Sequence, residues 1–442
     1  MKLNRREFLA GIGAAAVAPA VMSQMNAAER KPNIIFILAD DLGYGDVGCY
    51  GQKRIKTPNL DRMAAEGVRF TQCYAGSTVC APSRCALMVG QHTGHCIIRG
   101  NGTVPLRPED TTVAELLKKS GYATALIGKW GLGEAGTTGV PNRKGFDYFF
   151  GYLNQRHAHD YYTDHLWRNE EEVKIPAGTY SHDLFTKEAL DWVRKSADKP
   201  FFLYLAYTIP HANNEAGKQG MQVPSDEPYS GENWPQQQKN HAAMITRMDR
   251  DIGRLMDLLK ELDIDRDTVV FFSSDNGPHK EGGADPDFFD SNGPLRGIKR
   301  DLYDGGIRVP MIVRWPGRIE PGRTSDQVWA FWDFLPTAAE IAGARTPGHV
   351  DGISMLPALL GRPQRDHDYL YWEFHEGCFA QAVRFGRWKA VRVDKDKPIE
   401  LYDIESDIAE TRGLAADHPD LVKKAAGLMD SARTPSQHWP GK

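Results

Sequence analysis

The chain has few cysteines for its length, and none of them form a pair at metal-binding spacing. Six cysteines are spread over 442 residues, which is too few for a disulfide framework. No Cys-x-x-Cys pair occurs, so a zinc–thiolate site is not expected. Of the five cysteines other than Cys80, some could pair in an oxidising compartment, but we expect most to be buried free thiols.

An excess of positive charge is also missing. Lysine and arginine number 54 against 58 aspartate and glutamate residues, for a formal net charge of −4. This balance argues against a nucleic-acid partner. An anionic substrate would therefore need a local convergence of lysine and arginine side chains. Internal repeats and long low-complexity segments are absent as well.

No apolar run near the start is long enough for a membrane span. Arg5-Arg6 precede Phe8-Leu9, and a weakly apolar stretch rich in alanine and glycine covers residues 9–22. A spanning helix needs about 20 apolar residues, so we predict a twin-arginine export signal over residues 1–28, with a frayed helix as the alternative. This predicts a partner in the twin-arginine export machinery, no membrane span, and a periplasmic or extracellular protein. Cleavage could follow Ala20 or fall near Ala28.

Short apolar runs alternate with amphipathic segments through the first three quarters of the chain. Strands are predicted at 33–39, 123–127, 201–207 and 268–273, and helices at 112–120, 182–196 and 239–262. This alternation predicts an α/β fold, a mostly parallel doubly wound sheet flanked by helices, over residues 29–345. The polar stretch 213–238 is predicted to be a long surface loop near the site.

The pattern changes after about Gly343. Short strands are predicted at 369–374, 381–385, 388–393 and 399–402, followed by a helix at 419–431. Residues 346–442 are therefore predicted to form a small antiparallel sheet with one helix, a subdomain that completes the substrate cleft.

Two polar pairs follow predicted strands. Asp40-Asp41 ends the first strand and Asp275-Asn276 ends a later one. In open α/β sheets ligands bind beyond the carboxyl ends of the strands, so the two pairs can converge on one cation. Oxygen ligands favour Ca²⁺ or Mg²⁺ over Zn²⁺. Either pair alone could simply cap a turn; both together favour a metal site.

The run Cys80-Ala81-Pro82-Ser83-Arg84 and several other motifs resemble the type I, formylglycine-dependent sulfatases of the alkaline phosphatase superfamily. The other matching stretches, in the family's order, are NIIFILADDLGYGD, GKW-x-LG, FLYLAYTIPH, SSDNG and LRGIKRDLYDGGIRVPMIVRWP, and the later ELYDIESDIAET segment also fits. The resemblance covers nearly the whole chain after the predicted export signal. It implies a sulfuric ester hydrolase with an alkaline phosphatase-like fold.

The resemblance also implies roles for individual residues. Cys80 would be converted to formylglycine by a maturation enzyme, and its hydrate would be the nucleophile. Ca²⁺, in preference to Mg²⁺, would be held by Asp40, Asp41, Asp275, Asn276 and the hydrate at position 80. Arg84, Lys129 and Lys299 would offset negative charge in the transition state, and His211 would protonate the departing alcohol. We expect Arg84 in the first turn of a helix that begins near Pro82.

The implied reaction has two steps. One hydroxyl of the hydrated aldehyde attacks sulfur, and loss of a proton from the other then expels sulfate. The family commonly carries histidine two residues after the lysine, where this chain has Gly131. We expect His279, or less directly His92, to take over the role of that histidine.

Aromatic and polar residues are dense at 155–162 and 371–376, and a sugar would suit such surfaces. Candidate substrate contacts are His157, His159, His375 and Glu376, together with His279. We predict a sulfated glycan substrate, such as one with a sulfated galactose unit. The alternatives are a phosphoester or phosphonate hydrolase of the same superfamily, or a catalytically silent sulfated-glycan-binding protein.

Overall fold

The computed structural model describes residues 30–441, of which residues 32–441 belong to one compact unit. The predicted export signal lies outside the described residues. Among those residues, no helix has both the length and the apolar character to cross a bilayer.

A large sheet runs through the unit, with strand order β10-β2-β9-β8-β1-β7-β3-β4-β5-β6 and β11 paired to β2. Its central strands β8, β1, β7, β3 and β4 are mutually parallel, while β9, β5 and β6 join antiparallel. The bounds are β1 Asn33–Asp40, β2 Val68–Tyr74, β3 Ala123–Lys129, β4 Tyr148–Tyr152, β5 His165–Arg168, β6 Glu171–Lys174, β7 Phe201–Pro210, β8 Thr268–Ser274, β9 Arg308–Arg314, β10 Arg323–Ser325 and β11 Trp329–Ala330. The mostly parallel sheet predicted from the sequence is confirmed.

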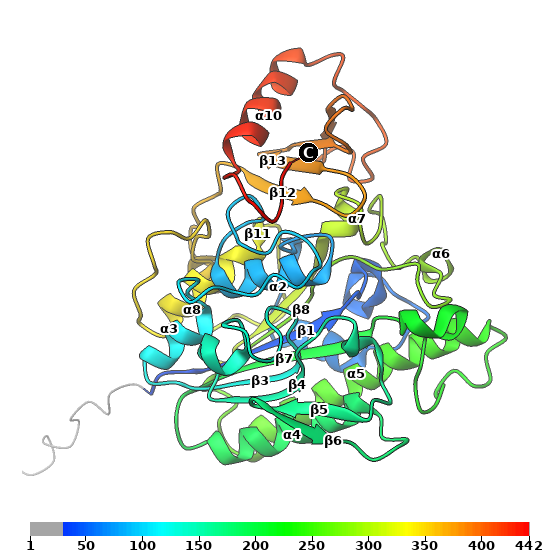
Figure 1. The fold of residues 1–442 in the computed structure, drawn as a ribbon, viewed down its shortest axis with the longest axis vertical. Coiled ribbons are helices and arrows are strands. Elements are labelled where there is room, and N and C mark those ends of the chain that lie inside the picture. Colours follow the sequence, from blue (N-terminus) through cyan, green and yellow to red (C-terminus); the bar gives the residue numbers. More distant parts are fainter. Residues whose placement is uncertain (1–29, 442) are drawn as a thin grey trace, which may run out of the picture. The chain divides into compact units, whose positions relative to one another are not determined.

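Helices cover both faces of this sheet (Figure 1). One face packs against α2 (Cys80–Val89), α3 (Val113–Lys119) and α8 (Phe334–Ile341), and the other against α1 (Pro58–Ala65), α4 (Ser181–Ser196) and α5 (Gln236–Glu261). The sequence of β1 is apolar without alternation because both faces of this strand are buried. Ile34, Phe36 and Leu38 enter one core, while Ile35 and Ile37 enter the other.

A second sheet of four antiparallel strands follows: β12 (Leu370–Phe374), β13 (Ala380–Phe385), β14 (Trp388–Arg392) and β15 (Glu400–Asp403). One face packs on α10 (Pro419–Ser431), through Ala425 and Met429. The other face packs on the main body, where Trp372 shares a core with Val79, the residue before α2, and with Ala86 inside α2. The predicted small sheet plus helix is confirmed, and it buttresses the helix that begins with Cys80. The boundary at residue 345 stays a prediction.

Some bounds differ from those predicted. Strand β7 continues three residues beyond Tyr207 because its pairing with β1 resumes after an irregularity, with Pro210 opposite Asp40. In the segment 213–238, a 3-10 turn forms at Asn214–Gln219 and α5 begins at Gln236. Three further short helices are α6 (Pro286–Phe289), α7 (Asp304–Ile307) and α9 (Leu356–Leu359). All six cysteines are free thiols.

Candidate active site

The carboxyl ends of four neighbouring strands bring polar side chains to one place. Strand β1 ends with Asp40, β3 with Lys129, and β7 and β8 are followed directly by His211 and Asp275. Each of these side chains is at most 2% exposed. Four parallel strands end at the same edge of the sheet, which is why residues up to 235 positions apart in sequence converge there.

Cys80 reaches this edge from the first position of α2. Its Sγ lies 3.4 Å from Oδ1 of Asp40. The prediction that the helix begins near Pro82 is wrong by two residues, and Arg84 is therefore in the second turn. The main-chain N–H of Ala81 donates to Oδ1 of Asn101 at 3.1 Å, so one of the orphan donors of the helix is satisfied. The dipole of α2 thus acts first on residue 80 itself.

Two buried cations flank Asp40. Lys129 Nζ lies 2.6 Å from its Oδ2, and Arg84 Nη2 lies 3.4 Å from the same oxygen. Arg84 also donates from Nε and Nη2 to Oδ2 of Asp275, at 3.0 and 2.8 Å. Burial opposes ionisation of Asp40, but Lys129 and Arg84 outweigh it and hold its pKa well below the usual range. Burial, and then the charge of Asp40, raise the pKa of Asp275 to about 7.

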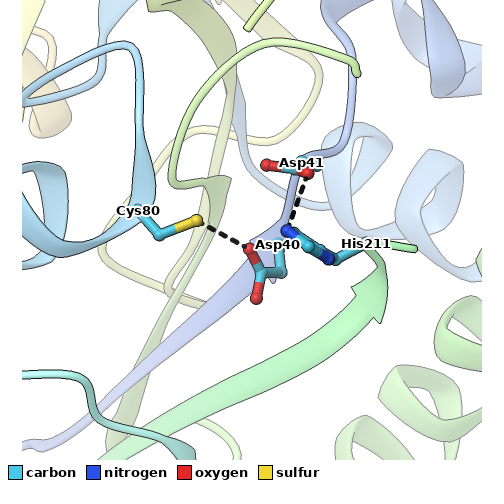
Figure 2. Close-up of side chains that lie close together, drawn as sticks. All are labelled: Asp40, Asp41, Cys80 and His211. Atoms are coloured by element: carbon cyan, nitrogen blue, oxygen red, sulfur yellow. Dashed lines mark hydrogen bonds and ion pairs between the residues drawn. The ribbon is translucent and has the colours of Figure 1, made fainter. Parts of the chain in front are cut away.

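Asp41 joins the second half of the site. Its backbone is left-handed, with φ of 63°, which turns its carboxylate back over the strand end. Lys299 Nζ donates to its Oδ2 at 2.8 Å, and Asn276 Nδ2 donates to its Oδ1 at 2.7 Å. Figure 2 shows Cys80 pointing toward Asp40 and His211 pointing toward Asp41, whose Oδ2 is 3.4 Å from Nε2 of His211.

The orientation of His211 is set by its neighbours. Nδ1 lies 2.6 Å from the carbonyl oxygen of Ala212, which can only accept, so Nδ1 carries the proton. Nε2 is then free to accept from Nζ of Lys299 at 3.0 Å. Burial, and then the charge of Lys299, lower the pKa of His211 well below its usual value. Lys299 itself is buried, yet Asp41 and Glu281 raise its pKa.

The donor set fits a hard divalent cation. Asp40, Asp41, Cys80 and His211 place one ligand atom each within 4.8 Å of one another. Asn276 Oδ1 is buried without a hydrogen-bond partner, and such an orphaned carbonyl oxygen suits a cation. With Asp275 alongside, the available ligands are oxygens from three carboxylates and one amide, which is the set that Ca²⁺ and Mg²⁺ prefer.

Of the predicted substrate contacts, His159 lies nearest to the catalytic candidates. Its ring stacks on that of His211 at 4.6 Å, and its Nδ1 lies 3.2 Å from Glu215. His157 lines a hollow of about 590 Å³ together with Arg156 and Glu215. A second hollow of about 300 Å³ lies beside Gly131 and Gln155. The two hollows share Asn154 and Arg156 in their linings.

The predicted substrate contacts His375 and Glu376 have their partners elsewhere, in and beside the C-terminal sheet. His375 contacts Glu373 through Nε2 at 2.9 Å and packs against Phe379 and Trp439, so it faces the C-terminal sheet. Glu376 accepts from Nε of Arg300 at 3.0 Å. Neither residue lines the two hollows described above.

The space beside Gly131 is not filled by either histidine expected there. His279 stacks near His211, at 5.7 Å, and its Nε2 lies 3.2 Å from the carbonyl of Pro210. His92 contacts His95, Trp332 and Tyr371 instead. The side chain found against Gly131 is that of Gln155.

Sequence reasoning missed two residues at this site. Glu281 Oε2 lies 3.3 Å from Nζ of Lys299 and 3.9 Å from Nε2 of His211, and its Oε1 pairs with Arg300. Burial opposes its charge, but Lys299 outweighs it and lowers the pKa of Glu281 to about 2. Glu281 stands outside the recognised motifs, and its only signal was proximity in sequence to His279. Gln155 begins the polar segment 155–162 that the sequence marked for sugar contacts, but it was not singled out there as an individual residue.

Comparison with known proteins agrees with this architecture. The family model described as Sulfatase matches residues 32–344, and a model described as N-sulphoglucosamine sulphohydrolase, C-terminal, matches residues 298–430. The N-acetylgalactosamine-6-sulfatase of Canis lupus familiaris is 34% identical over 82% of this chain and 72% of its own length. The steryl-sulfatase of Mus musculus is 31% identical over 87% of this chain and 74% of its own.

A solved structure described as Ps i-CgsB in complex with k-i-k-neocarrahexaose superposes with a TM-score of 0.82. It is 31% identical, over 93% of this chain and 95% of that one. The fold and these likenesses define a sulfuric ester hydrolase with an alkaline phosphatase-like architecture. The chain belongs to the sulfatase family.

Proposed function

We propose that this sulfatase releases sulfate from a sulfated sugar, with a formylglycine made from Cys80 as its nucleophile and Ca²⁺ held by Asp40, Asp41, Asp275 and Asn276. The observation that carries the proposal is the position of Cys80. Its Sγ is 3.4 Å from Asp40, at the start of α2 and among buried cationic side chains. When hydrated, a formylglycine supplies two hydroxyls on one carbon, one to attack sulfur and one whose proton loss expels sulfate.

The protein's own charges prepare the site for an anion. Arg84, Lys129 and Lys299 face the carboxylates of Asp40, Asp41 and Asp275, all at most 5% exposed. These three cations and three carboxylates balance, and Glu281, which also faces Lys299, is paired with Arg300, so a divalent cation leaves the pocket positive. A sulfate monoester carries one negative charge and offsets part of that excess. Cations fixed in a site that excludes water stabilise developing negative charge far better than they would in bulk solvent.

His211 and Lys299 together supply the proton for the leaving alcohol. In the arrangement seen here His211 is neutral and accepts at Nε2 from Lys299. The negative ester raises the proton affinity of this pair when it enters. A proton then moves from Nζ of Lys299 to Nε2 of His211, and from Nε2 to the departing oxygen once that oxygen has replaced Lys299 as its partner; Asp41 and Glu281 keep Lys299 charged beforehand.

The hollow of about 590 Å³ lined by His157 and Glu215 is the proposed place for the sugar. Its polar lining of Asn154, Arg156, Asp160, Asn213 and Glu215 suits hydroxyl groups. The flat ring of His159, stacked on His211, offers a face next to the proton donor. One relative is named for N-acetylgalactosamine 6-sulfate and one solved neighbour holds a neocarrahexaose, which supports a galactose-type unit.

Export and maturation complete the proposal. Arg5-Arg6 and the following weakly apolar run support passage through the twin-arginine machinery to the periplasm or beyond. The Cys80–Arg84 motif supports recognition by a formylglycine-generating enzyme.

The test combines chemistry at residue 80 with turnover. Mass spectrometry of the peptide that contains residue 80, from protein made in its own host, should show loss of hydrogen sulfide and gain of oxygen. The same preparation should release sulfate from sulfated galactose or N-acetylgalactosamine units faster than phosphate from a matched phosphate ester. An intact thiol with no sulfate release would favour a silent glycan-binding protein, and faster phosphate release would favour a phosphoester hydrolase.

A further inference from the structure

The backbone beside the nucleophile leaves no room for a side chain at residue 131. Gly131 has φ of +77°, a left-handed conformation that other residues rarely adopt. A Cβ placed on it would lie 1.8 Å from Nε2 and 2.5 Å from Cδ of Gln155. The amide group of Gln155 therefore occupies the space into which a side chain at residue 131 would project.

Two main-chain hydrogen bonds join the segment that contains Gly131 to the segment that leads to Gln155. Beyond the last pairs of β3 and β4, the N–H of Trp130 donates to the carbonyl of Tyr152 at 2.9 Å. The N–H of Gly131 likewise donates to the carbonyl of Leu153 at 3.1 Å. Gln155 lies two residues beyond the second of these bonds, in the turn that follows β4.

The amide nitrogen of Gln155 is buried and has no hydrogen-bond partner among the described residues. An unmade bond at a buried donor costs about 1–3 kcal/mol, so such donors are rare unless a ligand or water meets them. Gln155 lines the hollow of about 300 Å³, together with Asn101, Thr103 and Glu134.

This hollow lies next to the proposed nucleophile. Asn101, in its wall, accepts from the main-chain N–H of Ala81, the residue after Cys80. Gly131, in the opposite segment, is two residues beyond Lys129, whose carbonyl accepts from Nη1 of Arg84 at 3.0 Å. The walls of this hollow are thus linked through Asn101 to the residue after Cys80, and through the segment of Gly131 to Lys129 and Arg84.

We propose that the side-chain amide of Gln155 is a substrate-binding group that donates a hydrogen bond to a sulfuryl oxygen of the ester. The inference rests on the proposed function and deepens it. The chemistry is complementary, because an amide NH₂ only donates and a sulfuryl oxygen only accepts. Gln155 occupies the space beside Gly131, where the family commonly has a histidine. Unlike histidine, an amide would bind the sulfuryl oxygen without changing its protonation state with pH.

The first test compares Gln155→Met, which keeps the length but removes the donor, with Gln327→Met as the matched control. Gln327 lies in the segment between β10 and β11, where its side chain donates to Asp366, and it takes no part in the site. Losing one hydrogen bond to a charged group should lower kcat/KM for a sulfate ester about 10- to 100-fold. The Gln327→Met variant should stay within about twofold of wild type.

A third variant separates a binding role from a structural one. Gln155→Glu presents an anion to sulfate at neutral pH, so its kcat/KM should fall below that of Gln155→Met. It should recover as the pH is lowered and the acid becomes a donor, whereas Gln155→Met should keep the pH profile of wild type. A side chain that only fills space would show no such recovery.

Binding of inorganic sulfate to the calcium-loaded protein, measured by calorimetry, decides the inference without relying on turnover. Gln155→Met should bind sulfate about tenfold more weakly than wild type and Gln327→Met. Equal sulfate affinity in wild type and Gln155→Met overturns the inference, and the partner of the amide is then water. Failure of a formylglycine-bearing wild type to release sulfate from any ester would refute the proposed function alone.

Discussion

Replacing Lys389 with methionine tests how the C-terminal sheet holds the segment that carries Lys299. Lys389 Nζ, on β14, lies 2.6 Å from Oδ1 of Asp304 and 2.9 Å from Oε1 of Glu410, and all three side chains are fully buried. Glu410 also accepts from the main-chain N–H of Asp304 at 2.6 Å. Asp304 begins α7, five residues after Lys299, so this cluster fixes the start of that helix.

The Lys389→Met substitution leaves two buried carboxylates without their shared cation, although Arg308 still pairs with Asp304 at 3.2 Å. Breaking a buried ion pair from one side typically costs about 3–5 kcal/mol of unfolding free energy. The matched control is Lys187→Met on α4. Its Nζ lies at the same 2.6 Å from Asp191, but the two side chains are 73% and 38% exposed.

An exposed pair of this kind contributes only about 0.3–0.5 kcal/mol. Urea unfolding at pH 8, followed by tryptophan fluorescence, should therefore show a large loss of stability for Lys389→Met and almost none for Lys187→Met. Equal effects from the two substitutions would refute the reasoning, because burial is the main difference between the two pairs.

Three further predictions concern the site and its support. Cys80→Ser should lower steady-state sulfate release at least about a thousandfold and release the alcohol in a single burst, because a serine ester lacks the second hydroxyl that expels sulfate. Chelation of the cation should abolish sulfate release and lower the unfolding free energy by about 2.7 kcal/mol at a concentration of 100 Kd, and Ca²⁺ should restore both; unchanged stability would argue against the site. Burial, and then Asp304, which outweigh Lys389, raise the pKa of Glu410 from 4.5 to about 7. The folded protein then holds a proton that the unfolded chain has lost between these pH values, so stability should fall by about 3 kcal/mol as pH rises through that window. Glu410→Gln should flatten this slope, and a slope unchanged in Glu410→Gln would exclude Glu410 as its source.

Strands β1, β3, β7 and β8 could be predicted because their residues are apolar on both faces. Each of β1, β7 and β8 is fully buried, so an uninterrupted run of isoleucine, phenylalanine and valine was an unambiguous signal. Strands β5, β6 and β10, near the two ends of the sheet, are three or four residues long and partly exposed, and they escaped prediction, as did β2, β4, β9 and β11. Their pairing depends on neighbours distant in sequence rather than on their own composition.

The order of the polar motifs placed the candidate site correctly at one edge of the sheet, because each motif follows a strand. Gln155 and Glu281 could not be found in this way. Their places depend on how β4 and the segment after β8 pack against residues far along the chain, and no local pattern records such packing. The same holds for Lys389, whose partners lie 85 and 21 positions away.

The surroundings of Cys80 bear on why a thiol would be converted there. Burial, and then the charge of Asp40, raise the pKa of the Cys80 thiol well above its usual value. A thiol in that position stays protonated and is a weak nucleophile, because reactivity belongs to the thiolate. Asp40 Oδ1 faces Sγ as a hydrogen-bond acceptor, which suits a hydroxyl donor better than a sulfur anion. The carboxylate that would suppress a thiolate is thus the one that would hold a hydrate and its cation, so the charges of this site favour oxygen chemistry at residue 80 over sulfur chemistry.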